Sequence, residues 1–368
     1  MSLKFWMWNT YAPAADDILE QGILAWAAEN GMDVEISRDS DSDIAGKVMP
    51  ALEAGTLPDA LFAGSGDALR IMDAGGAAPL NDLWPLIGDA HGGWMPRLDQ
   101  YVTRDGVIGF LPYSIDTPMV HYRQDIFDAA GIAVPEGQWT WDEVRDLCMQ
   151  AQQYTEEQGD KKVGWGFGVV KQQHDGWCED IFRNFGADIW DESGQNIILK
   201  DQSSEAAVRA LTFAKEGWDM GLFPADAASW DWSSNNKSYQ EEQSIFVINS
   251  ASVYTWAQAN KPELVEVTGL APGPKDARHT TNAGLRYTVV MYKETKNAEA
   301  GQLIQGPYTP EIHGLVAGER LCHQRGARVR QPAHVGRQAR FQFNLAANIG
   351  APFTVATLPR TTTPPWPN

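Results

Sequence analysis

Strand-like and helix-like segments alternate through the first 62 residues, and this order constrains the fold more than any other feature. Residues 4–8 and 60–62 are short apolar runs, and residues 34–36 alternate apolar with polar side chains, as strands do. Residues 14–30 and 44–52 repeat apolar side chains at helical spacing, and each is followed closely by a glycine. A strand–helix–strand–helix–strand order predicts a parallel sheet covered by helices.

The mixed α/β pattern resumes after Tyr113. Thr140 and Glu143 have the spacing of a capping box, which predicts the start of a helix. Within that helix Cys148 shares an apolar face with Val144, so we expect Cys148 in a core. A chain of 368 residues is longer than one core usually serves, and the sequence therefore predicts two α/β lobes.

Composition argues against several classes of function. The net charge of −19 disfavours a nucleic-acid partner, because phosphates are bound by basic surfaces. No run of 18 apolar residues is present, so the sequence predicts no membrane-spanning helix. Cys148, Cys178 and Cys322 form no CxxC or Cys/His pattern. We expect inert thiols, with neither a metal nor a cofactor.

Six segments, in order along residues 51–311, resemble motifs of the family 1 extracellular solute-binding proteins, the group that includes maltose-binding protein. Most of the shared residues end helices, cap helices or begin strands, so the resemblance concerns the fold more than the ligand. The segments are 51–59 (ALEAGTLPD), 75–83 (GGAAPLNDL), 106–131 (GVIGFLPYSIDTPMVHYRQDIFDAAG), 139–143 (WTWDE), 292–305 (YKETKNAEAGQLIQ) and 308–311 (YTPE).

The resemblance implies a two-lobed periplasmic-binding-protein fold with hinge crossings and a central ligand cleft. The crossings are expected near residues 113–116, near 249–253 and near Gly306. Residues 1–112 and 253–305 would then form the N-terminal lobe, and residues 113–252 and 306–368 the C-terminal lobe. The implied function is a monomeric, non-enzymatic receptor that delivers a sugar or polyol to the transmembrane permease subunits of an ABC importer.

Candidate ligand residues lie where strands are expected to end, because loops at the carboxyl ends of strands carry the ligand groups in such sheets. Aromatic faces stack on sugar rings, while amides and carboxylates bind hydroxyl groups. Most of the 15 tryptophans are nevertheless expected to be packing residues. The candidates are Trp8, Asn9, Ser65, Asp67, Tyr113, Asp116, His174, Trp177, Trp230, Trp232, Asn249, Gly284, Arg286 and Tyr287.

Several of these candidates allow two interpretations. Asp116 matches an acidic position of the resembled family's crossing segment, but it could equally serve the hinge. Trp230 and Trp232 stand in a polar loop, where exposed aromatic side chains indicate a partner. Arg286 either forms a surface ion pair or binds an anionic ligand.

Two alternatives to a sugar receptor follow. A cleft arginine would suit an anionic solute such as a sugar phosphate or a uronate. A glycoside hydrolase would need two carboxyl groups held across a glycosidic bond, and the sequence identifies no such pair.

Both ends of the sequence are unusual. The first strand begins at once, which we interpret as a signal peptide already removed from a periplasmic or otherwise extracytoplasmic protein. Residues 306–368 hold seven arginines, no lysine, no aspartate and two glutamates, in contrast to the acidic remainder. Either a reading-frame disruption near Gly306 or a divergent basic segment accounts for this composition.

Overall fold

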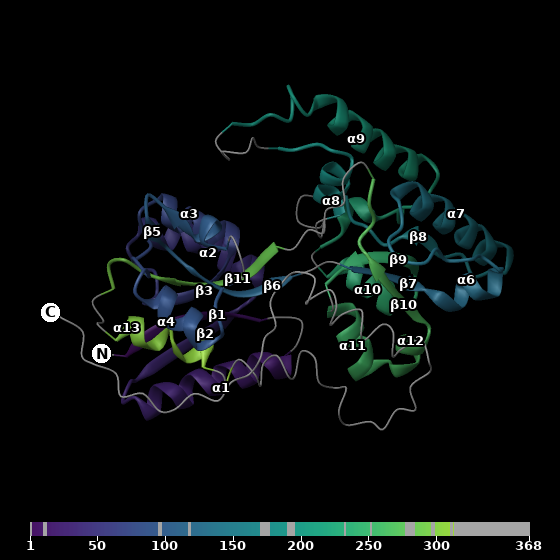
Figure 1. The fold of residues 1–368 in the computed structure, drawn as a ribbon. Coiled ribbons are helices and arrows are strands. Elements are labelled where there is room, and N and C mark those ends of the chain that lie inside the picture. Colours follow the sequence, from purple (N-terminus) through teal and green to yellow (C-terminus); the bar gives the residue numbers. More distant parts are fainter. Residues whose placement is uncertain are drawn as a thin grey trace. The chain divides into compact units, whose positions relative to one another are not determined.

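The computed structural model describes residues 2–9, 13–94, 98–116, 119–169, 177–189, 196–231, 233–250, 252–276, 284–295, 299–309 and 312. These residues form two compact α/β units (Figure 1). The first unit takes the chain up to Ile115 and the described residues from Leu285 onward, and the second takes Asp116–Gly284.

A five-stranded sheet forms the centre of the first unit, in the order β2-β1-β3-β11-β6. The first three strands are parallel, with Leu3 opposite Val34 and Phe5 opposite Ala60, and β11 runs antiparallel to β3. The strands are β1 (Leu3–Trp8), β2 (Val34–Asp39), β3 (Ala60–Gly64), β6 (Leu111–Asp116) and β11 (Gly284–Met291).

Helices cover both faces of this sheet because the strand order reverses direction at β1. Right-handed crossovers then put α1, between β1 and β2, on one face and α2, between β2 and β3, on the other, as Figure 1 shows. The other elements outside this sheet are shorter than α1 and α2. The elements outside the sheet are α1 (Pro13–Glu29), α2 (Asp41–Glu53), α3 (Ser65–Asp73), α4 (Leu83–Ala90), α5 (Asp99–Val102), β4 (Thr103–Arg104), β5 (Val107–Ile108), α13 (Ala300–Leu303) and η2 (Gly306–Tyr308).

The second unit contains a four-stranded sheet in the order β10-β7-β9-β8. Strands β10 and β9 both run antiparallel to β7, and β8 runs parallel to β9. The strands are β7 (Met119–Arg123), β8 (Val163–Trp165), β9 (Ser244–Asn249) and β10 (Thr268–Pro272). The helices are α6 (Gln124–Ala130), α7 (Trp141–Glu157), α8 (Trp177–Asn184), α9 (Ser204–Asp219), η1 (Ala227–Ser229), α10 (Ser234–Gln240), α11 (Ser252–Asn260) and α12 (Pro262–Glu266).

The predicted capping box at the start of α7 is confirmed. The Thr140 hydroxyl accepts a hydrogen bond from the backbone N–H of Glu143 at 3.1 Å, and the Thr140 N–H donates to the Glu143 carboxylate at 2.7 Å. Cys148 is fully buried, as expected, and burial raises the pKa of its thiol well above the usual value. The side chains of Cys178 and Cys322 lie outside the described part of the chain.

The chain returns to the first unit later than the sequence predicted. Residues 253–276 were expected in the N-terminal lobe, but β10 pairs along β7, from Thr268 opposite Arg123 to Pro272 opposite Met119. Helices α11 and α12 pack against the same sheet through a core that includes Val247 of β9. Strand β10 thus forms one edge of the sheet in the second unit. The chain passes to the first unit between Gly284 and Leu285.

The described residues after 305 also differ from expectation, because they pack in the first unit. The Tyr308 hydroxyl donates to the backbone oxygen of Leu111 at 3.1 Å, and its ring meets that of Tyr113 edge-on at 5.5 Å. Ile312 is buried against α1, where a Cβ added to Gly22 would lie 2.8 Å from Ile312 Cγ1. Residues 313–368, which carry most of the basic composition, lie outside the described residues.

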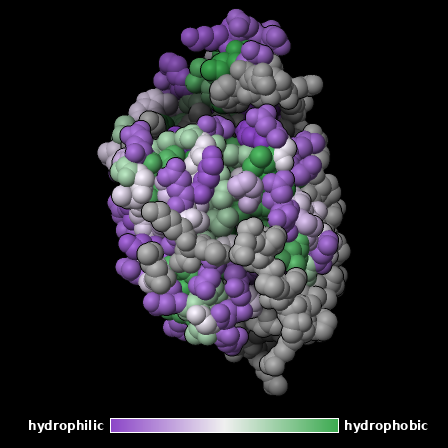
Figure 2. All heavy atoms as spheres, turned by 90° about the vertical axis from the view of Figure 1, so that its left-hand side faces the viewer, coloured by the Kyte–Doolittle hydropathy of each residue, from purple (hydrophilic) through white to green (hydrophobic). Residues whose placement is uncertain are grey.

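The face drawn in Figure 2 is mainly hydrophilic, with hydrophobic side chains scattered among the polar ones. This surface suits a chain with a net charge of −19. Among the described residues, no helix is both long and apolar enough to cross a membrane.

Candidate functional site

The carboxyl ends of β1, β2 and β3 meet at one edge of the first sheet, which we call the strand-end edge. Because the three strands are parallel neighbours, the residues that follow them lie side by side. Asn9 follows β1, Ser40 follows β2, and Ser65 follows β3. The start of β11 reaches the same edge, since Tyr287 is the register partner of Gly64. Predicted candidates from distant parts of the sequence thus converge here.

Trp8 is a packing residue at this edge. Its side chain is only 4% exposed, and it lies over the end of β3, where a Cβ added to Gly64 would be 3.2 Å from Trp8 Cη2. Gly64 therefore leaves the room that the indole occupies. Such burial leaves little of the Trp8 side chain for contact with a ligand.

Asn9 is exposed and held at two points. Its backbone N–H donates to the backbone oxygen of Asp39 at 2.9 Å, which extends the β1–β2 pairing by one residue. Its side-chain Oδ1 accepts a hydrogen bond from Arg38 Nε at 3.0 Å. The residue thus has a defined orientation although it lies in a loop.

Asp67 lies in the first turn of α3, where the helix dipole favours a negative charge. The residue is 8% exposed, and its Oδ1 accepts from Arg70 Nη1 at 3.2 Å. Asp67 Oδ2 would lie 3.9 Å from a Cβ on Gly64, so the carboxylate, like the Trp8 ring, borders the end of β3. Ser65, at the start of the same helix, is half-buried.

The cations of the strand-end edge are held in ion pairs. Arg38 Nη1 contacts Asp17 at 2.6 Å and Glu20 at 2.9 Å, and Lys47 pairs with Asp39. These pairs have the expected effects: the hydrogen bond from Lys47 lowers the pKa of Asp39, and that to Asp17 raises the pKa of Arg38. Among the described side chains, Arg38, Lys47 and Arg70 contact more carboxylates than their own number: Asp16, Asp17, Glu20, Asp39 and Asp67.

Asn249 of the second unit is engaged in structural hydrogen bonds. At the end of β9, its Nδ2 donates to Asn236 Oδ1 of α10 at 2.5 Å. Its Oδ1 accepts from the Ser250 N–H at 2.7 Å and from the Ser252 hydroxyl at 3.3 Å. The side chain therefore ties β9 to α10 and to the start of α11, which leaves little of its capacity for a ligand.

Trp230 is buried, whereas its polar sequence neighbours indicated an exposed aromatic. It is 8% exposed and follows η1, whose Ala227 N–H bonds back to Pro224. The next residue, Asp231, is exposed and was not among the predicted candidates. Its Oδ1 accepts from the Ser233 N–H and hydroxyl, both at 2.9 Å, and from the Ser234 hydroxyl at 2.8 Å. These bonds, that from Ser234 first, lower the pKa of Asp231. The Asp-x-Ser-Ser pattern signals such a turn in the sequence.

The other candidates are placed to different extents. Tyr113 lies in the first core, its ring 4.9 Å from that of Phe62. The backbone alone is described for five candidates, and two lie outside the described residues. The five are Asp116 in β6, Trp177 at the start of α8, and Gly284, Arg286 and Tyr287 in β11; the two are His174 and Trp232.

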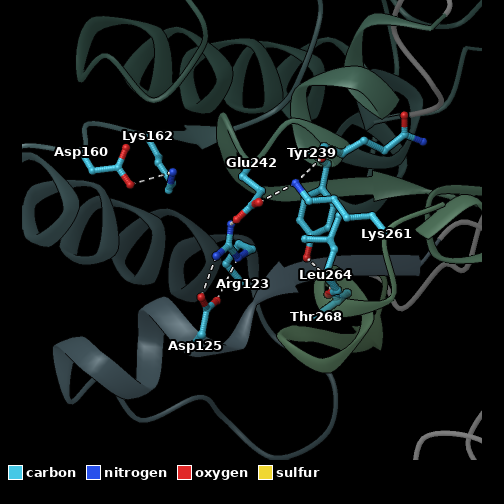
Figure 3. A network of polar contacts seen from close by, with 10 residues as sticks. Arg123, Asp125, Asp160, Lys162, Tyr239, Glu242, Lys261, Leu264 and Thr268 are labelled. Carbon is cyan, nitrogen blue, oxygen red and sulfur yellow. Dashed lines mark hydrogen bonds and ion pairs between the residues drawn. The ribbon is translucent and has the colours of Figure 1, made fainter. Parts of the chain in front are cut away.

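A second charged network, drawn in Figure 3, centres on Arg123 of the second unit. Arg123 contacts Asp125 at 2.6 Å and Glu242 at 2.7 Å, and Lys261 contacts Glu242 at 2.5 Å. Arg123 lies at the opposite end of β7 from Met119, which pairs with Asn249 of β9. The network holds the turn before β9 against α11 and α12, so we assign it to stability. Among the described residues, no three His, Cys, Asp or Glu side chains are grouped as metal ligands.

Comparisons with known proteins point to one family of binding proteins. The family model described as "Bacterial extracellular solute-binding protein" matches residues 23–311. Binding proteins of Brucella abortus and Brucella suis are 22% identical over 254 residues, which is 69% of this chain. The chain spans 58% of the length of these relatives.

Solved structures share the fold at low identity. MalE3 of T. maritima with bound maltose has a TM-score of 0.74 at 18% identity, covering 96% of this chain and 90% of its own. A solute-binding protein of Thermotoga lettingae with bound tagatose has a TM-score of 0.73 at 18% identity, covering 95% and 86%. One from Agrobacterium vitis with bound mannitol has a TM-score of 0.66 at 20% identity, covering 87% and 75%.

Proposed function

This chain belongs to the family of bacterial extracellular solute-binding proteins, and from that premise we propose that it binds a neutral carbohydrate for an ABC importer. The ligand class is a mono- or oligosaccharide or a polyol. The strand-end edge supports this class because it offers an amide at Asn9, a hydroxyl at Ser65 and a carboxylate at Asp67. Amides and carboxylates are the groups that bind sugar hydroxyls through directed hydrogen bonds.

The pairing of the cations is the observation that carries the choice of a neutral ligand. Arginine and lysine side chains that can turn toward a ligand are the usual partners of a phosphate or carboxylate. Arg38 and Lys47 are half-buried and paired with carboxylates, the exposed Arg70 bonds to Asp67, and the five carboxylates that they contact outnumber them. The described side chains at this edge carry net negative charge, which would repel an anion but not a neutral hydroxyl group. The sugars and the polyol bound by the three structural relatives agree with this choice.

The site residues of the proposal fall into two groups. Asn9, Ser65 and Asp67 supply the hydrogen bonds of the first unit, with Trp8 contributing the small part of its side chain that is exposed. The candidates Asp116, His174, Trp177, Trp232, Gly284, Arg286 and Tyr287 remain part of the proposal. If Arg286 reaches the ligand, an anionic solute such as a sugar phosphate or uronate becomes the better candidate.

The family is one of extracellular binding proteins, so the chain acts outside the cytoplasm. We place it in the periplasm or in another extracytoplasmic location. It works as a monomer that docks on the transmembrane permease subunits and performs no chemistry on its ligand.

A thermal-shift series tests the ligand class. A ligand that binds only the folded state raises the Tm by mass action. Maltose, tagatose and mannitol represent neutral ligands, and glucose 6-phosphate and glucuronate represent anions. We expect a rise with one neutral compound. A rise confined to the anions would transfer the proposal to the anionic class, and hydrolysis of maltose would refute the binding-only role.

A further inference from the structure

We propose that Arg38 is a positioning residue that fixes the carboxamide of Asn9 so that its NH2 group donates to a ligand hydroxyl. This inference rests on the proposed function, because it assumes a polyhydroxylated ligand at the strand-end edge. Arg38 would not touch the ligand itself.

The chemistry of the two groups determines which end of the carboxamide is presented. A guanidinium only donates hydrogen bonds, so the atom of Asn9 that faces Arg38 Nε at 3.0 Å must be the oxygen. The NH2 group then points away from Arg38. Among the described residues, no side chain or backbone group is hydrogen-bonded to Asn9 Nδ2, and the residue is exposed. Two N–H donors are thus available at the edge.

Arg38 is itself immobilised, which is what allows it to act as a fixed support. Its Nη1 bonds to Asp17 and Glu20 of α1, and its Nη2 lies 3.9 Å from the buried carboxylate of Asp16. Its side chain is 23% exposed. Strand pairing brings Arg38 close to Asn9, because Arg38 lies opposite Met7 while the Asn9 N–H bonds to the backbone oxygen of Asp39. The fork of one guanidinium therefore joins α1, β2 and the loop after β1.

The arrangement lowers the cost of binding. A free asparagine side chain in a loop loses rotational freedom when it bonds to a ligand, whereas one already held loses little. It also selects the partner: the edge offers donors at Asn9 and an acceptor at Asp67. The hydroxyl groups of a sugar or polyol, which both donate and accept, can pair with either.

A double-mutant cycle tests whether Arg38 acts through Asn9. Calorimetry would measure the Kd of whichever of maltose, tagatose or mannitol binds the wild-type protein, for Asn9→Ala, Arg38→Met and the double variant. We expect each single variant to weaken binding about tenfold, the value of one lost hydrogen bond. The double variant should bind no more weakly than Asn9→Ala. Losses that multiply would overturn the proposal while leaving the sugar-binding function intact.

Arg145→Met is the matched control. Arg145 of α7 also contacts three carboxylates, those of Asp142, Asp146 and Glu216, and its side chain is 20% exposed. The carboxylates that it contacts all lie in the second unit, so affinity should stay within about twofold of wild type. If Arg38→Met fails to fold, Arg38→Lys keeps a positive charge among the carboxylates and enters the cycle under the same criterion.

The side-chain amide of Asn9 gives a readout that needs no ligand. Its NMR signals are those absent from Asn9→Asp, and their order parameter should fall in Arg38→Met and stay high in Arg145→Met. An unchanged order parameter in Arg38→Met would refute the positioning role. If none of the three probes binds, the proposed function fails, and the order parameter alone decides whether Arg38 holds Asn9.

Discussion

Acidification should destabilise the second unit through one buried histidine, His121 in β7. Its side chain is fully buried, with its ring 6.2 Å from that of Tyr239. Burial lowers the pKa of His121 to about 4, and a hydrogen bond with the Met119 backbone only partly opposes this. In the unfolded chain the pKa of histidine is about 6.5. Between these values the unfolded state binds the proton and the folded state does not, so stability falls as the pH falls.

The size of the effect follows from the two pKa values. A gap of about 2.5 pKa units corresponds to about 3.4 kcal/mol, of which about 2 kcal/mol is lost between pH 7.5 and pH 5. Urea unfolding followed by tryptophan fluorescence would measure the free energy of unfolding at both pH values. Hydrogen exchange of the β9 amides would assign the transition to the second unit.

The comparison with His121→Asn isolates this residue from the carboxylates that also titrate. The variant should be less stable at both pH values but should lose about 2 kcal/mol less than the wild type on acidification. His91→Asn, in the first unit, retains His121 and should lose as much as the wild type. Equal acid losses in wild type and His121→Asn would refute the reasoning.

Three further pairs of substitutions test other parts of the account. Arg123→Ala should cost about 2 kcal/mol, since it removes a buried guanidinium that bonds to Asp125 and Glu242, whereas Lys215→Ala, in an exposed pair with Asp219, should cost under about 0.5 kcal/mol; equal costs in urea unfolding would contradict the burial of Arg123. Ile312→Ala should cost about 2–4 kcal/mol, and Gly22→Ala should also destabilise the protein. The double variant should recover part of the loss, because the methyl group that Gly22→Ala adds enters the space that Ile312 vacates. Additive losses of stability would mean that the two residues do not touch. Trp8→Ala should cost about 3–5 kcal/mol and Asn9→Ala under about 0.5 kcal/mol; a small Tm change for Trp8→Ala would show that the indole is not a packing residue.

Local patterns allowed much of the fold to be predicted. The first strand was expected over residues 4–8 and is Leu3–Trp8, and the first helix was expected over residues 14–30 and is Pro13–Glu29. The Thr140–Glu143 cap and the burial of Cys148 were also confirmed, because each depends on residues within one helix.

Contacts between distant residues could not be predicted in this way. Nothing in the sequence of β10 specifies that it pairs with β7 across about 150 residues, so its lobe was predicted differently. The burial of Trp230 was not predicted, because its neighbours in the sequence are polar and its burial depends on the tertiary fold.

The candidate site was predictable only in part for the same reason. The loops after β1 and β3 follow from strand ends, and Asn9, Ser65 and Asp67 were found that way. Arg38 was not found, because its role depends on bonds to residues 18–29 positions away. Asn249 likewise bonds to Asn236 of α10, an element whose packing the sequence does not reveal.

The most direct test of the central claim is a calorimetric titration of the wild-type protein and Asp67→Asn with neutral and anionic sugars side by side. The account predicts that one neutral compound among maltose, tagatose and mannitol binds more tightly than glucose 6-phosphate or glucuronate. It also predicts that Asp67→Asn weakens that binding about tenfold or more, since a charged acceptor is lost. Tightest binding of an anion, or neutral-sugar binding unaffected by Asp67→Asn, would contradict the account.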